Sequence, residues 1–237
     1  MQTIIVNIVW IVSYFITWPI TRLIWPVKMT VDKSVTKLKG PIIIISNHKS
    51  VFDPWLVPGA IPFRVFIKLL PIRILATKDY SDPTCVWLEK FKLISLAHYL
   101  YGAISITKSL SFEEKTDPVV NAIKKGQSVI IFPEGGLNKE KTIGNFRRGV
   151  PYIYARTHAL ILPCSVNFTK AGTVVNVGHP LRISESIITA EDTPGSFYDN
   201  SCIFLRDAVV RLFKKIPPSA KAHPAHLPGK FKSAKHG

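Results

Sequence analysis

The chain has 237 residues, and its 31 Lys and Arg against 15 Asp and Glu give a formal net charge of +16. This length suits one domain with a substantial core plus appendages. The charge favours an anionic partner, either nucleic acid or a membrane surface. Three widely separated cysteines exclude a disulfide framework and a cysteine metal motif, which indicates a reduced cytoplasmic setting: Cys85, Cys164 and Cys202.

The N-terminal segment is apolar, and no charged side chain precedes Arg22. Residues 3–18, continuing to 24, are rich in Ile, Val, Trp and Phe, and about 20 such residues are enough to cross a bilayer. Pro19 would kink or end this helix, so a shallow helix in one leaflet is an alternative to a full span. A cleaved signal peptide is disfavoured because the segment lacks a basic start and a small-residue cleavage site. Three tryptophans suit the membrane interface: Trp10, Trp18 and Trp25.

Charge also marks the two ends of the folded domain. Basic residues follow the apolar segment from Arg22 onward, so the positive-inside rule places the next domain in the cytoplasm. Residues 217–237 are basic and contain several prolines, which predicts a tail without fixed structure. We therefore expect a membrane-anchoring helix at 1–25, a folded domain at 26–216 and a disordered tail at 217–237.

Strands alternate with helices along the folded part of the chain. This alternation predicts an α/β domain with a largely parallel sheet flanked by helices. The expected strands cover residues 29–38, at an edge of the sheet, and 41–46, 72–77, 102–108, 128–132, 160–166 and 173–177. The expected helices cover residues 54–59, 82–100, 116–125, 149–157 and 196–215.

His48 and Asp53 follow the apolar strand at 41–46. A spacing of five puts two side chains on different faces of a continuous helix, so they can meet only if the chain turns between them. Asp53 and Pro54 supply that turn, because Asp suits an N-cap and Pro suits the first helical position. An imidazole oriented by a carboxylate can serve as a general base. Taken alone, the pair could also be a helix cap and a polar loop residue.

Two further polar side chains lie at the ends of predicted strands. Residues 128–132 run into Pro133, Glu134, Gly135 and Gly136, where glycines let a ligand approach the backbone. Lys108 ends the predicted strand at 102–108. Because ligands of α/β sheets bind beyond the carboxyl ends of the strands, we expect His48, Lys108 and Glu134 at one edge of the sheet. On its own, the glycine-containing segment could be an ordinary turn.

Four blocks of the sequence resemble the membrane-associated glycerolipid acyltransferases, typified by lysophosphatidate acyltransferase. The first is His48 to Asp53, with four residues between them, and the third is Phe-Pro-Glu-Gly at 132–135. The second is a Gly-x-Ile strand ending in a cation at 102–108, and the fourth is a strand with an internal proline at 161–164. Residues 76–78 and 146–149 are also similar, so the resemblance covers residues 38–180 in the family's order.

The resemblance implies an O-acyltransferase of phospholipid biosynthesis that moves a fatty acyl group onto a lysophospholipid hydroxyl, converting 1-acylglycerol-3-phosphate into phosphatidate. It implies that His48 is the general base and that Asp53 orients the imidazole. Glu134 and Gly135 would bind the substrate, with Glu134 ordering the acceptor or the loops around it, and three cations would bind the acceptor's anionic head group: Lys108, Arg147 and Arg148.

The resemblance also implies the partners. The acyl donor would be acyl-CoA or acyl carrier protein, used as a co-substrate, and no bound cofactor is expected. No metal is expected either, because the sequence has no HExxH, no paired-cysteine motif and no carboxylate cluster. The other partners would be lipids of the cytoplasmic membrane, with the catalytic domain facing the cytoplasm.

Two positions depart from the family's pattern. Gly136 and Leu137 replace the usual Thr-Arg, which removes one expected contact with the acceptor's phosphate. Lys108 replaces the usual Arg and loses the forked geometry that suits phosphate. Arg147 and Arg148 could compensate, or could be a solvated helix start, or the acceptor could carry another head group.

Three alternatives therefore stay open at this point. The acceptor could be another lysolipid, such as a lyso-amino-lipid. The chain could be a non-catalytic membrane lipid-binding protein, although the intact His48 and Asp53 argue against this. Nucleic-acid binding through the basic tail is disfavoured, because such a protein would not need the apolar first 24 residues and no nucleic-acid motif is present.

Overall fold

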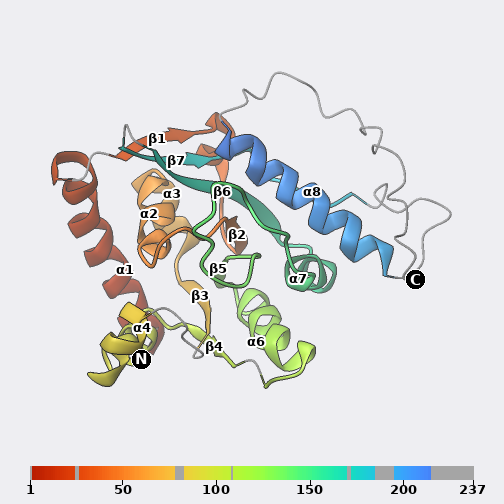
Figure 1. The fold of residues 1–237 in the computed structure, drawn as a ribbon, viewed down its shortest axis with the longest axis horizontal. Coiled ribbons are helices and arrows are strands. Elements are labelled where there is room, and N and C mark those ends of the chain that lie inside the picture. The colour runs from red at the N-terminus through yellow and green to blue at the C-terminus, as the bar shows by residue number, and fades with distance from the viewer. Residues whose placement is uncertain are drawn as a thin grey trace, which may run out of the picture.

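The structure is a computed structural model that describes residues 2–24, 27–77, 83–107, 109–169, 172–184 and 195–214. Within these ranges the strands form one seven-stranded sheet with helices on both faces (Figure 1). Several expectations lie outside the described residues: Trp25, Lys78, Lys108 and the tail at 217–237.

The sheet has the order β1-β7-β6-β2-β5-β3-β4. Neighbouring strands run parallel except β6 and β7, which are antiparallel. The predicted α/β fold with a largely parallel sheet is therefore confirmed. The strands are β1 (Val27–Val31), β2 (Ile42–Ser46), β3 (Ile72–Thr77), β4 (Ile104–Ile106), β5 (Ser128–Ile131), β6 (Leu160–Thr169) and β7 (Gly172–Val177).

Strand β2 lies in the middle of the sheet, and each of its residues is buried. Its isoleucines alternate between two hydrophobic cores, with Ile42 and Ile44 in one and Ile43 and Ile45 in the other. Burial on both faces explains why this strand is an unbroken apolar run rather than an alternating one.

Two layers of helices cover the two faces of the sheet (Figure 1). Helices α1 (Gln2–Pro19), α2 (Asp53–Ala60) and α3 (Phe63–Leu69) contribute side chains to the first core. Helices α6 (Phe112–Lys124), α7 (Gly149–Thr157) and α8 (Ser196–Phe213) contribute to the second. Strands β2 to β6 all run in one direction and end at one edge between these layers, while β1 and β7 run the opposite way.

Helix α1 packs against the sheet domain along one face. Trp10 is 2% exposed and donates its indole N–H to the carbonyl of Ile72 at 2.8 Å. Val6 is buried, and the Tyr14 hydroxyl donates to the carbonyl of Ile61 at 2.9 Å. The helix is long and apolar enough to cross a membrane by length and composition, although this test alone does not set it apart from a core helix. It ends as an α-helix at Pro19 and continues as the π-helical turn η1 (Ile20–Ile24).

The strand predicted at residues 29–38 is wrong in its second half. Strand β1 ends at Val31 and is followed by the 3₁₀-helix η2 (Lys33–Lys37). Asp32 caps this helix, because its carboxylate accepts a hydrogen bond from the backbone N–H of Ser34 at 2.9 Å. The buried Val35 and Leu38 are three residues apart, which matches a 3₁₀ turn.

The helix predicted at residues 82–100 is two helices, α4 (Pro83–Lys90) and α5 (Leu93–Leu100). Lys92 between them adopts a left-handed conformation with φ of 55°, which ends the first helical path. The Glu89 carboxylate then accepts hydrogen bonds from the backbone N–H and the hydroxyl of Ser95. Local capping therefore overrides the apolar spacing that suggested one continuous helix.

Helix α6 begins four residues before its predicted start at residue 116. Ser111 and Glu114 form a capping box, in which each side chain bonds the other residue's backbone N–H. This arrangement satisfies two backbone donors of the first turn. Pro118 consequently lies inside the helix rather than at its beginning.

The packing of α1 predicts that Trp10→Ala lowers the free energy of unfolding by about 3–5 kcal/mol, because a large buried side chain and its hydrogen bond are lost. Urea unfolding of the full chain in detergent micelles measures this. The control is Trp18→Ala on the same helix, where the side chain is 49% exposed and a much smaller loss is expected. Equal losses in the two variants would show that α1 does not belong to the domain's core.

Candidate active site

The candidate site lies at the carboxyl end of β2, where the chain leaves the middle of the sheet. Residues 47–52 form a loop between β2 and α2, and residues 132–148 follow the neighbouring strand β5. Because β2 and β5 pair in parallel, both connections begin at the same edge of the sheet. Topology therefore brings His48 and Glu134, 86 residues apart, into one site.

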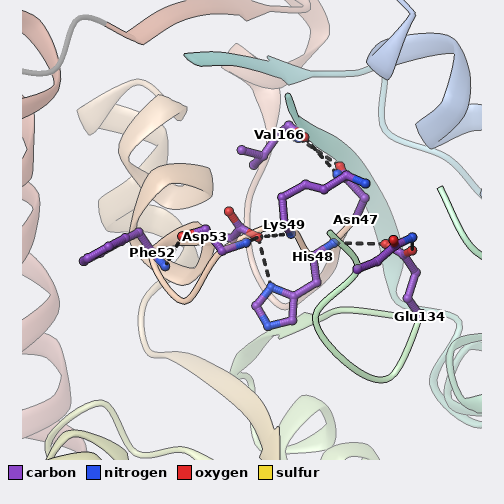
Figure 2. A network of polar contacts seen from close by, with 9 residues as sticks. Asn47, His48, Lys49, Phe52, Asp53, Glu134 and Val166 are labelled. Atoms are coloured by element: carbon purple, nitrogen blue, oxygen red, sulfur yellow. Dashed lines mark hydrogen bonds and ion pairs between the residues drawn. The ribbon is translucent and has the colours of Figure 1, made fainter. Parts of the chain in front are cut away.

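His48 and Asp53 are in contact, with Nδ1 of the imidazole 2.9 Å from Oδ2 of the carboxylate (Figure 2). The same Oδ2 accepts the backbone N–H groups of Lys49 at 2.6 Å and Ser50 at 2.9 Å. Since Oδ2 is an acceptor for all its neighbours, Nδ1 of His48 carries a proton, and in the neutral imidazole Nε2 is then the nitrogen with the lone pair. The Asp53 side chain is fully buried, while 18% of the His48 side chain is exposed.

Asp53 does not cap α2 as predicted. The helix begins at Asp53 itself, its N-cap is Phe52, and no side chain caps it. The carboxylate instead turns back to the loop before the helix. There it accepts hydrogen bonds from the imidazole of His48 and from the backbone N–H groups of Lys49 and Ser50. Pro54 does lie at the first positions of the helix, where its missing N–H costs nothing.

The His48 ring is also held by stacking on Phe132. The two ring centroids are 4.0 Å apart and the planes are inclined by 16°. Figure 2 shows the far edge of the imidazole directed away from Asp53. One ring face and one nitrogen are thus fixed by the protein, and the Nε2 edge points away from these contacts.

Asn47, which the sequence analysis missed, anchors the loop to β6. Its side-chain amide donates to the carbonyl of Val166 at 2.8 Å and accepts the N–H of Val166 at 2.9 Å (Figure 2). The residue is fully buried. A signal was present in the sequence, because an amide directly after an apolar buried strand must find partners for both ends.

Glu134 lies beside the backbone of His48 rather than beside its imidazole. Its Oε1 accepts the N–H of His48 at 3.0 Å. Its Oε2 accepts the side-chain amide of Asn138 at 2.5 Å and the N–H of Gly144 at 2.7 Å. The carboxylate therefore joins the loop at residues 47–52 to two places in the segment at residues 135–146, which we call the glycine loop.

Lys49 is a second residue that the sequence analysis did not single out. Its ammonium donates to the carbonyls of Glu140 at 2.5 Å and Thr142 at 3.0 Å, both in the glycine loop. Burial lowers the pKa of Lys49, while the charges of Glu134, Glu140 and Asp53 act in the opposite direction. A backbone bond from Asn138 N–H to the His48 carbonyl, at 2.7 Å, completes this side of the loop.

Helix α8 supports the glycine loop from the other side. Arg206 donates from Nε to the Gly144 carbonyl at 2.9 Å and from Nη2 to the Ile143 carbonyl at 2.8 Å. Gly135 begins the loop with φ of +77°, and a Cβ there would come within 2.4 Å of Nε of Arg147. The positive φ favours glycine at 135, and the absence of a Cβ leaves room for the Arg147 guanidinium beside it.

The three cations predicted to bind the head group differ in where the structure places them. Arg147 is exposed and crosses Gly135 beside the glycine loop. Arg148 is exposed too, but its guanidinium grips Asp199 of α8 with two bonds, at 2.7 and 2.6 Å. This pairing raises the pKa of Arg148 and lowers that of Asp199. Lys108 lies outside the described residues, so the structure places only Arg147 at the predicted site.

Metal ligands do not gather in the part of the chain that the structure describes. No group of three or more His, Cys, Asp or Glu side chains there could hold a metal ion. The polar groups of the site are instead one imidazole, two carboxylates and several cations, which is a set suited to proton transfer and to binding an anion.

Two comparisons with known proteins are informative. The model of the acyltransferase family matches residues 27–167, which is more than half of the chain. The fold is also similar to the crystal structure of the 1-acyl-sn-glycerophosphate (LPA) acyltransferase PlsC from Thermotoga maritima, with a TM-score of 0.52. That similarity covers 81% of this chain and 73% of PlsC at 16% sequence identity, so it is a likeness of fold.

The contacts of Glu134 predict that Glu134→Gln loosens the glycine loop. A glutamine side chain has one oxygen, so its NH₂ group would face either the N–H of His48 or the donors of Asn138 and Gly144. The hydrogen bonds to the charged carboxylate, worth about 1.5–3 kcal/mol each, would be lost on that side. Trypsin cleavage after Lys139 and Lys141, followed by mass spectrometry, should become about tenfold faster or more.

The matched control for the loop is Glu140→Gln. Glu140 lies in the same loop and accepts the hydrogen bond of Lys49 through its backbone carbonyl, which the substitution keeps. Its replacement should leave the cleavage rate near that of the unmodified chain. If both variants were cleaved at the same rate, Glu134 would not be what holds the loop.

Proposed function

Because this chain belongs to the acyltransferase family, we propose that it transfers a fatty acyl group from an acyl thioester to the hydroxyl of a lysophospholipid at a membrane. The proposed acceptor is 1-acylglycerol-3-phosphate and the product is phosphatidate. The observation that carries this proposal is the contact between His48 Nδ1 and the buried Asp53 carboxylate at the end of β2. The proposed donors are acyl-CoA and acyl carrier protein, each used as a co-substrate.

The chemistry begins with a proton transfer. Nε2 of His48 removes the proton from the acceptor's hydroxyl as that oxygen attacks the thioester carbonyl. The C–S bond of the resulting tetrahedral intermediate then breaks, and the imidazolium returns the proton to the departing thiolate. Asp53 keeps the proton on Nδ1 throughout and stabilises the imidazolium, so that Nε2 is the atom that exchanges protons.

The oxyanion of the tetrahedral intermediate needs hydrogen-bond donors as well. Three nearby backbone N–H groups already donate to carboxylates, His48 to Glu134 and the next two residues to Asp53. These groups therefore shape the loop, and stabilisation of the oxyanion falls to other donors. Glu134 acts in this scheme by fixing the backbone of His48 rather than by touching the acceptor.

The cations near the site bear on which head group the acceptor carries. Arg147 beside Gly135 supports a phosphate, because a guanidinium can bind phosphate oxygens with two parallel bonds. Leu137 and the pairing of Arg148 with Asp199 favour a second candidate, a lysolipid whose head group carries less negative charge. The two candidates share the same transfer chemistry at His48.

The membrane setting is supported by helix α1, which is apolar and has an exposed outer face. Both lipids of the proposed reaction reside in the bilayer, so a protein held at its surface meets them in two dimensions. The basic tail would add about 1 kcal/mol of attraction to anionic lipids for each Lys or Arg close to the surface. We place the catalytic domain on the cytoplasmic side, as the charge asymmetry predicts.

The central prediction concerns the base. His48→Ala should lower kcat for transfer from acyl-CoA to lysophosphatidate by about 10²–10⁴, the usual contribution of a general base. The assay uses purified protein in detergent micelles with isotope-labelled donor and mass spectrometry of the product. His179→Ala is the control, because it removes another histidine that contacts an aspartate, Asp32, at an exposed position. Full activity of His48→Ala would show that another group takes the proton.

A second prediction separates the two arginines. Arg147→Ala should raise KM for lysophosphatidate more than tenfold and leave KM for a lysolipid with a neutral head group almost unchanged, since a charged bond worth about 1.5–3 kcal/mol is lost only with phosphate. Arg148→Ala serves as the matched control, because Asp199 already occupies its guanidinium. A rise in KM with both acceptors would assign Arg147 a structural role.

A further inference from the structure

Helix α5 is apolar, yet none of its side chains is buried. The exposed fractions of Leu93, Leu96 and Tyr99 are 47%, 52% and 56%. The preceding helix α4 adds Trp87 at 57% and Phe91 at 63%. Large apolar side chains exposed together on two consecutive helices are unfavourable in water, which marks them as a contact surface. We call the exposed apolar residues of these helices the α4–α5 surface: Val86, Trp87, Phe91, Leu93, Leu96 and Tyr99.

Cations border the α4–α5 surface. Lys90 and Lys92 are exposed at the turn between the two helices. Glu89 is the one acidic residue between positions 83 and 100, and its carboxylate is occupied by Ser95. Aromatic and aliphatic side chains beside lysines are typical of segments that lie in a membrane interface with anionic lipids.

The α4–α5 surface is continuous with helix α1. The Tyr101 ring, at the end of α5, packs edge-on against Trp10 of α1 with centroids 4.9 Å apart. Ser13 of α1 shares a hydrogen bond with the Tyr101 hydroxyl. Figure 1 shows α1 and α4 at the same side of the molecule. The outer face of α1 is itself exposed and apolar: Ile4, Ile8, Val12, Phe15 and Ile16.

Further aromatic contacts lead from this side of the molecule to the loop at residues 47–52. Tyr101 packs against Trp55 of α2, with centroids 5.6 Å apart, and Trp55 is 6.4 Å from Phe52. Phe52 is 52% exposed and directly precedes Asp53. An apolar path therefore joins the α4–α5 surface to the residues that hold His48.

We propose that the α4–α5 surface is a second membrane-docking element, which inserts with the outer face of α1 into one leaflet of a bilayer containing anionic lipids. This inference rests on the proposed function, because it places the catalytic loop beside the layer that holds the lipid substrates. The lysines argue for an anionic bilayer over a second copy of the chain, since a symmetric dimer would bring the two copies of Lys90 and Lys92 together.

The docking also fixes the orientation of α1. Its contacts with the domain at Val6, Trp10 and Tyr14 extend over about 12 Å of helix, at 1.5 Å per residue. If α1 crossed the bilayer along these contacts, it would draw the domain against which it packs into hydrocarbon, where the polar groups of the domain's loops are costly. The helix therefore lies along the leaflet with one face on the protein and the other in lipid.

The test measures vesicle binding without any catalysis. Full-chain protein is diluted from detergent onto vesicles of phosphatidylcholine, with or without a third of phosphatidylglycerol, and the floating fraction gives the partition coefficient. Phe91→Ser and Leu96→Ser should each lower it by about tenfold, the loss expected for one large apolar side chain. Ile203→Ser on α8 is the matched control, because it is also exposed, at 47%, but lies on the other face of the sheet. Lys90→Gln with Lys92→Gln should remove much of the preference for anionic vesicles.

Activity then separates this inference from the proposed function. With short-chain, water-soluble donor and acceptor, Phe91→Ser should keep full transfer activity, while transfer to a vesicle-embedded acceptor falls with vesicle binding. Unchanged vesicle binding of Phe91→Ser and Leu96→Ser would overturn the inference, whatever the catalytic result. So would a shift from dimer to monomer in these variants without a loss of vesicle binding, since the surface would then contact a second copy.

Discussion

The buried carboxylate oxygen Oδ2 of Asp53 is the atom on which the candidate site depends. Three N–H groups of the preceding loop converge on it: the His48 imidazole and the backbone groups of Lys49 and Ser50. Hydrogen bonds to a charged group contribute about 1.5–3 kcal/mol each. These bonds stabilise the conformation in which residues 47–52 fold back over the start of α2. The chain turns tightly at this point because one oxygen gathers these donors.

A second set of contacts fixes the position of this turn relative to the rest of the domain. Glu134 and Lys49 each reach from one strand connection to the other, and Arg206 braces the glycine loop from α8. The site is thus built from groups that mostly bind backbone atoms rather than one another's side chains. Such an arrangement fixes the position of the imidazole through the peptide chain and leaves its Nε2 edge for chemistry.

The sequence predicted what depends on local pattern, and less of what depends on distant partners. The alternation of strands and helices, and the turn that lets His48 meet Asp53, follow from spacing and local propensity. The contacts of Glu134 and the pairing of Arg148 with Asp199, 51 residues away, depend on strand order and on the placement of α8, which no local pattern encodes. The break at Lys92 has the reverse cause: the apolar spacing runs without interruption across a cap that Glu89 and Ser95 form locally.

Asn47 shows how the chain leaves the sheet without breaking it. A side-chain carboxamide has the same donor and acceptor as a peptide group, and Asn47 offers both to Val166 of β6. The hydrogen-bond ladder of the sheet is therefore extended by one pair of bonds that uses no main-chain atoms of the loop at residues 47–52. The N–H and carbonyl of His48 are released from the sheet, and they bind Glu134 and Asn138 instead. Because the side chain of Asn47 makes the bonds to β6, the peptide groups of His48 are free to bind the segment that follows β5.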